Sequence, residues 1–265
     1  MITKSGENIV DAILLAGGYA TRLYPLTKDR PKALLPVGGK PILDYVVEEL
    51  ETSDKIDKLF LVTNAKFAPH FQEWADRYVE GENIQILDDG TDSNADRLGA
   101  LGDVRFVLNH ADVDTDSGVY VLGTDNLADF NITDIVDLAL EKKGSAVFAS
   151  RIDSEGKLTR MGVATVNDEG RVVDFIEKPD DPPSNLAVPP FYVYSPNAVQ
   201  LLRDYLNDES NNPDAPGHYI SWLVHQDDVY ALITDQTVLD IGTPESYQEV
   251  QEKWSGGEEM FTGKS

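Results

Sequence analysis

The sequence predicts an α/β fold, in which helices cover a mostly parallel central sheet and a β-hairpin lobe is added. In the first half, short apolar runs typical of buried strands alternate with helical segments, which favours parallel pairing with both faces covered. In the second half, two strand-like runs flank Asp168-Glu169-Gly170, a turn typical of a hairpin. The 265 residues fit one large domain.

The elements follow from local pattern. Buried strands are expected where apolar residues run together, at 10–16, 58–63, 118–123 and 145–150. Helices are expected at 41–51, 67–78 and 133–143, the first two from apolar residues at helical spacing and the first also from Pro41, which suits a first turn.

The second half begins with the hairpin strands 163–167 and 171–176. A Pro-rich connection is expected at 179–190. The remaining elements are expected as strands at 191–194, 229–233 and 237–241 and helices at 196–206 and 219–225. The Gly-rich tail from Ser255 is expected to be loose.

Composition excludes several classes of protein. The net charge is −25, which opposes long-range attraction to nucleic acid and anionic membranes. No apolar run reaches the roughly 18 residues of a membrane span, and the polar start 1–8 lacks the apolar stretch of a signal peptide. The absence of cysteine excludes disulfides, thiolate metal sites and Cys nucleophiles. We therefore expect a cytoplasmic protein that binds neither nucleic acid nor membranes.

The acidic excess predicts adaptation to high salt. The chain has 30 Asp and 17 Glu against 13 Lys and 9 Arg. These charges repel one another in the compact state, and the Debye length shrinks to roughly 3 Å at about 1 M salt. We expect the melting temperature to rise from dilute buffer to molar KCl, and a flat or falling series would contradict this interpretation.

The strongest local motif is LAGGYATRLYPLTKDRPKALLP at 15–36, directly after the first buried strand. Open α/β sheets bind ligands at this position, and Gly17 and Gly18 let backbone N–H groups approach a phosphate. The dinucleotide fingerprint G-x-G-x-x-G and the P-loop pattern are both absent from it. Four cations gather within eleven residues of an acidic chain and indicate an anionic ligand: Arg22, Lys28, Arg30 and Lys32.

This segment resembles the signature of the sugar-1-phosphate nucleotidylyltransferases, G-G-x-G-T-R-L-x-P-L-T followed by P-K. The resemblance runs from about 10 to 252 and implies a Rossmann-like fold, most similar to the short glucose-1-phosphate thymidylyltransferases and uridylyltransferases. It divides the single domain into a nucleotide-binding half at 9–125 and a sugar-binding half at 126–254. Ala20 departs from the pattern, because the family usually has Gly there and Ala disfavours positive φ.

The resemblance places the triphosphate on Arg22 and Lys32 as catalytic cations. Fixed cations stabilise the charge that grows on departing pyrophosphate. It also implies that the nucleotide contacts two backbone segments: Leu15, Ala16, Gly17 and Gly18 in the loop, and Leu98 and Gly99 before a helix. The alternative for Gly99 is a helix start that needs Gly for packing.

Two carboxylates are implied as Mg²⁺ ligands. Asp125 lies in Gly-Thr-Asp-Asn and Asp240 in Asp-Ile-Gly-Thr, which resemble the two metal-binding motifs of the family. Both follow apolar strands, and Mg²⁺ typically takes one or two carboxylates together with substrate phosphates.

The sugar half carries three further motifs. Arg-Met-Gly-Val resembles the family's R-Y-G-V and implies that Gly162 lies against the sugar. Glu177-Lys178-Pro179 matches E-K-P, in which the Glu accepts sugar hydroxyls and the Lys binds the 1-phosphate as a further catalytic cation. Asn185 and Tyr192 are the remaining candidate sugar contacts.

The expected reaction joins UTP or dTTP to a sugar 1-phosphate, with glucose 1-phosphate favoured, and releases pyrophosphate. The alternatives are a mannose-1-phosphate guanylyltransferase, a nucleotide-sensing regulatory module without turnover, and a nicotinamide-dependent oxidoreductase, which the missing G-x-G-x-x-G disfavours. The expected partners are the two small-molecule substrates, and the chain could form a homo-oligomer.

Overall fold

The computed structural model describes residues 9–77, 83–236 and 238–255. The strands are β1 Val10–Leu15, β2 Pro36–Val37, β3 Lys40–Pro41, β4 Ile56–Thr63, β5 Ile84–Asp88, β6 Val119–Gly123, β7 Asn126–Ala128, β8 Ser145–Arg151, β9 Gly162–Val166, β10 Val172–Glu177, β11 Leu186–Val188, β12 Phe191–Tyr194, β13 Val229–Thr234 and β14 Val238–Asp240. The helices are α1 Ile42–Thr52, α2 Ala68–Arg77, α3 Ala100–His110, α4 Asp134–Lys142, α5 Glu155–Leu158, α6 Pro196–Asn207, α7 Pro216–Leu223 and α8 Pro244–Ser255, with 3-10 turns η1 Thr21–Leu23 and η2 Lys32–Leu34.

A ten-stranded sheet forms the centre of the described chain, in the order β10-β9-β11-β8-β12-β6-β1-β4-β5, with β13 beside β8. Strands β6, β1, β4 and β5 are parallel, as predicted for the first half. Strand β12 enters between β6 and β8 and is antiparallel to both. The carboxyl ends of β1, β4 and β6 therefore meet at one edge of the sheet.

The hairpin predicted in the second half is confirmed as β9 and β10, and it continues the central sheet. Strand β11 makes this connection because it pairs with β8 on one side and β9 on the other. The prediction that 179–190 is only a connection is wrong, since β11 lies within it. Its three residues, Leu-Ala-Val, are too few to show an alternating pattern in the sequence.

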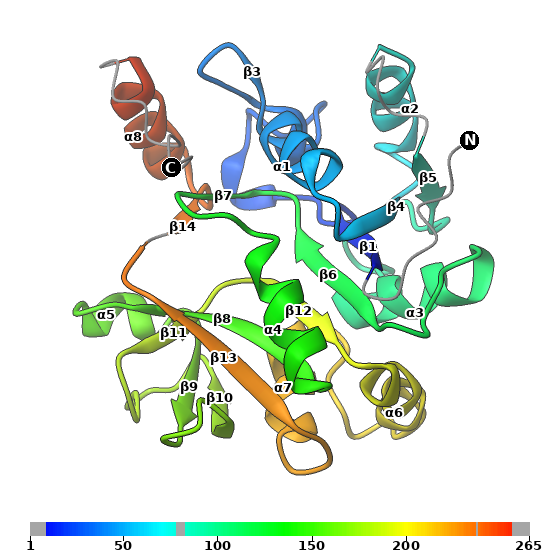
Figure 1. Cartoon of the computed structure of the whole chain (residues 1–265). Helices are drawn as coiled ribbons and strands as arrows, with labels where there is room; N and C mark the ends of the chain where they lie inside the picture. The colour runs from blue at the N-terminus through cyan, green and yellow to red at the C-terminus, as the bar shows by residue number, and fades with distance from the viewer. Residues whose placement is uncertain (1–8, 78–82, 237, 256–265) are drawn as a thin grey trace.

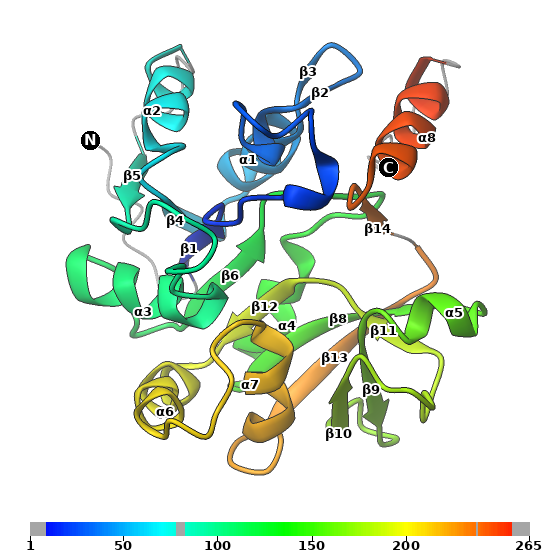
Figure 2. The ribbon, with the colours of Figure 1, turned by 180° about the vertical axis from the view of Figure 1, so that it is seen from behind.

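The core lies on both faces of the sheet, because neighbouring residues of β1 point to opposite sides. Ile13 packs with buried residues of α3, α6 and α7, whereas Ala12 and Leu14 pack with α1, α2 and α4. Helix α4 lies in front of the sheet in Figure 1 and α7 in front of it in Figure 2. This arrangement confirms the predicted α/β fold covered by helices.

The basic loop and the residue after it pack against the last described helix. Leu23 and Val37 form a small buried cluster with Ile241 and with Val250 of α8. The loop that carries the basic residues is therefore held by the C-terminal helix. In the described part of the chain, none of the helices has the length and apolar character needed to cross a bilayer.

Candidate functional site

The loop after β1 is tied to the sheet through its carbonyl oxygens. Each carbonyl accepts a hydrogen bond from a side chain at or just beyond the end of a neighbouring strand: Thr124 Oγ1 to Leu15 at 2.9 Å, Thr63 Oγ1 to Ala16 at 3.2 Å and Asn64 Nδ2 to Gly17 at 2.9 Å. Among the described residues, the N–H groups of Gly17 and Gly18 donate no hydrogen bond. They are available for phosphate oxygens, as the motif predicts.

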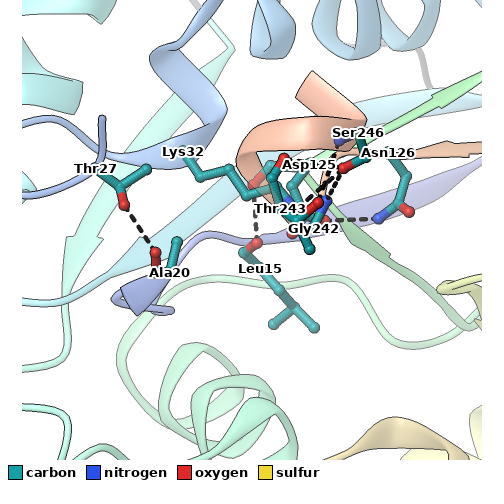
Figure 3. A network of polar contacts seen from close by, with 10 residues as sticks. Leu15, Ala20, Thr27, Lys32, Asp125, Asn126, Gly242, Thr243 and Ser246 are labelled. Atoms are coloured by element: carbon teal, nitrogen blue, oxygen red, sulfur yellow. Dashed lines mark hydrogen bonds and ion pairs between the residues drawn. The ribbon is translucent and has the colours of Figure 1, made fainter. Parts of the chain in front are cut away.

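Ala20 adopts a left-handed backbone conformation, which favours Gly. Its φ of 45° and ψ of 43° are left-handed, and its carbonyl accepts a hydrogen bond from the buried Thr27 hydroxyl at 2.7 Å (Figure 3). The Ala at this position is therefore strained.

The Ala20→Gly substitution is expected to raise the free energy of unfolding by about 0.5–1 kcal/mol. The left-handed region costs a Cβ-bearing residue about 1–2 kcal/mol, and the added freedom of Gly in the unfolded chain offsets part of the gain. Urea unfolding measures the change. Ala75→Gly within α2 is the control and is expected to lose about 1 kcal/mol. A loss of stability in both variants would contradict the strain at Ala20.

A cavity of about 240 Å³ opens above this loop. Its lining includes six of the predicted site residues: Leu15, Ala16, Gly18, Arg22, Lys32 and Asp125. Gly242, which follows β14, also lines it. Segments from the beginning, middle and end of the chain thus form one concave site.

Lys32 and Asp125 meet in this cavity, although 93 residues separate them in the chain. Lys32 Nζ lies 2.8 Å from Asp125 Oδ2, and Asn126 Nδ2 donates to Asp125 Oδ1 at 2.6 Å (Figure 3). The Lys32 side chain is 12% exposed and the Asp125 side chain 39%. A positively charged side chain therefore lies beside a carboxylate that is accessible from the cavity.

The backbone of Asp240 lies close to that of Asp125 in the fold. Strand β14 pairs with β7, and Asp240 lies opposite Asn126, the residue after Asp125. The side chain of Asp240 is outside the described part of the structure. Within that part, three or more potential ligands do not converge at one point. Two carboxylates suit Mg²⁺, which fills its other positions with water and substrate phosphates.

Three of the predicted sugar residues lie near the Glu177 carboxylate: Gly162, Lys178 and Tyr192. A Cβ added to Gly162 would lie 3.1 Å from Glu177 Oε2, and one added to Gly217 would lie 1.9 Å from the same atom. The Glu177 side chain is only 11% exposed, so β9 and the start of α7 hold it in place through these two glycines. Gly217 was not identified from the sequence, where it follows a Pro at an ordinary helix start.

Lys178 lies beside this carboxylate and remains accessible. Its Nζ is 3.3 Å from Glu177 Oε1, its side chain is 59% exposed, and its φ of 51° is left-handed. A non-Gly residue in this region is strained, and such strain is typical of functional positions. Tyr192 is buried nearby, and its pKa is raised by burial and then by the Glu177 charge. Asn185 lies exposed before β11, and its carbonyl accepts a hydrogen bond from the Ile152 N–H.

The residues that line the cavity and the residues around Glu177 lie at the same edge of the sheet. Gly123, at the end of β6, donates its N–H to Pro190 O at 3.0 Å. Two residues earlier, Val188 pairs with Gly162, which in turn pairs with Glu177. The residues around Glu177 thus lie at the same edge as the cavity above the loop after β1.

Leu98 and Gly99 lie at the start of α3 and are not among the residues that line the cavity. A Cβ on Gly99 would approach Pro213 O to 2.8 Å, and its φ is 77°. The packing alternative for Gly99 therefore has structural support, and contact with a nucleobase stays a prediction.

Three polar residues at strand ends were missed from the sequence: Thr63, Asn64 and Thr124. Each binds a carbonyl of the loop after β1. Their common signal is a position at or just beyond the end of a parallel strand, the same rule that singled out Asp125.

Comparison with known proteins agrees with this geometry. The family model described as nucleotidyl transferase matches residues 11–256. The chain is 31% identical over 248 residues to UTP–glucose-1-phosphate uridylyltransferase AglF of Haloferax volcanii, covering 92% of this chain and 96% of that protein. It is 30% identical to the low-salt glycan biosynthesis nucleotidyltransferase Agl11 of the same organism, covering 91% of this chain and 64% of that protein.

Among solved structures, the fold is similar to UDP-glucose pyrophosphorylase complexed with UDP-glucose, with a TM-score of 0.79 and 20% identity. The match covers 94% of this chain and 99% of the other. The family model spans nearly the whole chain, and the similarity to AglF has the same extent. This chain belongs to the nucleotidyl transferase family.

Proposed function

We propose that this chain transfers a nucleotidyl group from UTP or dTTP to a sugar 1-phosphate, with glucose 1-phosphate favoured, and releases pyrophosphate. The observation that carries the proposal is the contact between Lys32 and Asp125 in a cavity lined by the Gly-rich loop. The similarity to a uridylyltransferase along the whole length of both chains supports the choice of base and sugar.

In this proposal the sugar 1-phosphate oxygen attacks the α-phosphorus of the triphosphate, and the bond to pyrophosphate breaks in line with the attack. A phosphate monoester has a second pKa near 6, so its oxygen is already ionised at neutral pH and needs no general base. Catalysis then depends on position and on balancing charge.

Each group has one task. Lys178 holds the attacking phosphate, and the Glu177 carboxylate accepts hydrogen bonds from sugar hydroxyls. Arg22 and Lys32 hold the departing pyrophosphate, while the N–H groups of Gly17 and Gly18 orient the triphosphate. Asp125 and Asp240 would hold Mg²⁺, which when bound neutralises phosphate charge. The nucleotide half is 9–125 and the sugar half 126–254.

A grid of nucleoside triphosphates against sugar 1-phosphates, with pyrophosphate release as the readout, tests this function. The highest rate is expected with UTP or dTTP and glucose 1-phosphate. A preference for GTP and mannose 1-phosphate would indicate a guanylyltransferase. Nucleotide binding without pyrophosphate release in any pair would indicate a regulatory module and contradict the proposal.

Lys178→Ala is expected to raise the KM for the sugar 1-phosphate about tenfold or more, because a hydrogen bond to a charged group contributes about 1.5–3 kcal/mol. The affinity for triphosphate, measured without sugar, should change much less. The exposed Lys157 of α5 provides a matched control, Lys157→Ala, with the same loss of charge. Equal losses for both substrates would point to a structural role for Lys178.

A further inference from the structure

Two carboxyl groups converge beneath the nucleotide loop. Asp103 lies in the first turn of α3, is 6% exposed, and its Oδ1 has no hydrogen-bond partner among the described residues. A Cβ added to Gly17 would come within 2.6 Å of Asp103 Oδ2 and within 3.6 Å of Asp89 Oδ2. A larger residue at position 17 would have to displace the Asp103 carboxyl, which occupies the space next to the loop backbone.

Asp89 is held as a hydrogen-bond acceptor. Its Oδ1 accepts from the Thr91 N–H and the Thr91 hydroxyl, each at 2.7 Å. Its Oδ2 and the Oδ2 of Asp103 both lie next to the same point beside Gly17. Ionised carboxylates only accept hydrogen bonds and repel each other, so a proton shared between the two groups would stabilise this arrangement.

The pKa of Asp103 is raised to about 8. Burial is the largest cause, the charge of Asp89 is the second, and hydrogen bonding with Asp89 is the third. The first turn of a helix favours a negative charge, but burial and the nearby carboxylate outweigh that effect. Other titratable groups lie on the elements that pack against α3: Asp11 and Tyr19 on or after β1, Asp57 and Lys58 on β4, Arg203, Asp204 and Tyr205 on α6, Asp214 paired with Arg97 before α7, and His218 and Tyr219 on α7. None of these groups contributes to the raised pKa of Asp103, whose causes are burial and Asp89.

We propose that Asp89 and Asp103 share one proton and act as a positioning pair that holds Gly17 in the form that binds the triphosphate. The inference rests on the proposed nucleotide-binding role of the loop. With the proton present, the carboxyls stay together against Gly17 and carry a single negative charge. Without it, two carboxylates repel each other beside the loop and also repel the anionic phosphates.

Nucleotide binding should therefore weaken above the pKa of the pair. If the bound triphosphate requires the shared proton, its affinity falls about tenfold for each pH unit above about 8. The unsubstituted protein is not expected to show this loss of affinity below pH 7.5, where the pair keeps its proton.

The test measures the Kd of UTP with Mg²⁺ by calorimetry between pH 7.5 and 9.5. The unsubstituted protein should lose about tenfold in affinity between pH 8 and 9. Asp103→Asn should lose less than about twofold, because the amide N–H replaces the shared proton. Asp92→Asn is the matched control: it removes one exposed negative charge from the same acidic loop and should keep the pH dependence of the unsubstituted protein.

Asp89→Asn should flatten the profile in the same way and provides a second variant if Asp103→Asn does not fold. The proposal would be overturned if the affinity for UTP fell with pH as steeply in both Asn variants as in the unsubstituted protein. It would also be overturned if the unsubstituted protein showed no loss of affinity near pH 8.

Failure of UTP and the other triphosphates to bind at pH 7.5 would contradict the proposed function instead, and melting curves would then still test the pair. The pKa of Asp103 is raised on folding, so its contribution to stability is complete below about pH 4 and is lost as the pH rises to about 8. The melting temperature of Asp103→Asn relative to the unsubstituted protein should therefore climb from pH 4 to 8. A constant difference would overturn the shared proton.

Discussion

Replacing Lys32 by Ala is expected to lower the rate of pyrophosphate release about a hundredfold or more. In the proposed reaction, Lys32 stabilises charge that develops on the leaving group. The loss of one such donor typically costs about 3 kcal/mol of transition-state stabilisation. The Lys32 side chain is only 12% exposed and lines the cavity, so water in the variant would be a poor substitute for its positive charge.

The same substitution should change stability far less than turnover. The ion pair with Asp125 is partly open to solvent, since the carboxylate side chain is 39% exposed, and such pairs contribute about 0–1 kcal/mol. A urea unfolding curve separates this small effect from the kinetic one. A large loss of stability with nearly normal turnover would contradict the catalytic assignment.

Lys66→Ala is the matched control for charge. Lys66 is an exposed cation next to the same loop, and its Nζ contacts the Lys28 carbonyl. The control removes the same unit charge from this region outside the cavity, and its turnover should stay within about threefold of the unsubstituted protein. If Lys66→Ala lost as much as Lys32→Ala, general electrostatic attraction of the nucleotide would explain both.

The contact between Lys32 and Asp125 could be predicted from the sequence because one rule applies to both residues. Asp125 comes just after an apolar strand and Lys32 lies in the loop that follows another, and the carboxyl ends of neighbouring parallel strands meet at one edge. The structure places β1 beside β6 in parallel, which brings the two motifs together. The sequence also shows Ala20 as a departure from the family pattern, and the structure gives it a left-handed φ, a conformation that disfavours a residue with a Cβ.

Asp103 and Gly217 could not be found from the sequence, since their roles depend on residues distant along the chain. Asp103 looks like an ordinary acidic residue in a helix's first turn until Gly17 and Asp89 enclose it. Gly217 follows a Pro at a helix start, and only the fold brings the Glu177 carboxylate against it. Local pattern gives the type of element and its ends, whereas burial of a polar group is decided by long-range packing.

Asp125→Asn is expected to lower activity about a hundredfold at ordinary Mg²⁺ and to raise the Mg²⁺ concentration needed for half-maximal rate. The amide keeps the size of the side chain but loses the charge that attracts a divalent cation. Initial rates of pyrophosphate release against Mg²⁺, at saturating UTP and sugar 1-phosphate, measure both effects. Asp116→Asn, an exposed carboxylate shortly before the opposite end of β6, is the control and should follow the unsubstituted curve.

The double variant Lys32→Ala/Asp125→Asn tests whether the two residues serve one centre. Each single variant removes the contact between the two side chains, so part of each loss is the loss of that one contact. Residues in direct contact typically couple by about 0.5–3 kcal/mol, and the 2.8 Å separation of Nζ and Oδ2 places this pair in that class. We therefore expect the double variant to lose less activity than the product of the two single losses. Strictly multiplicative losses, together with an unchanged Mg²⁺ curve for Asp125→Asn, would remove Asp125 from the metal site and leave Lys32 acting on the triphosphate alone.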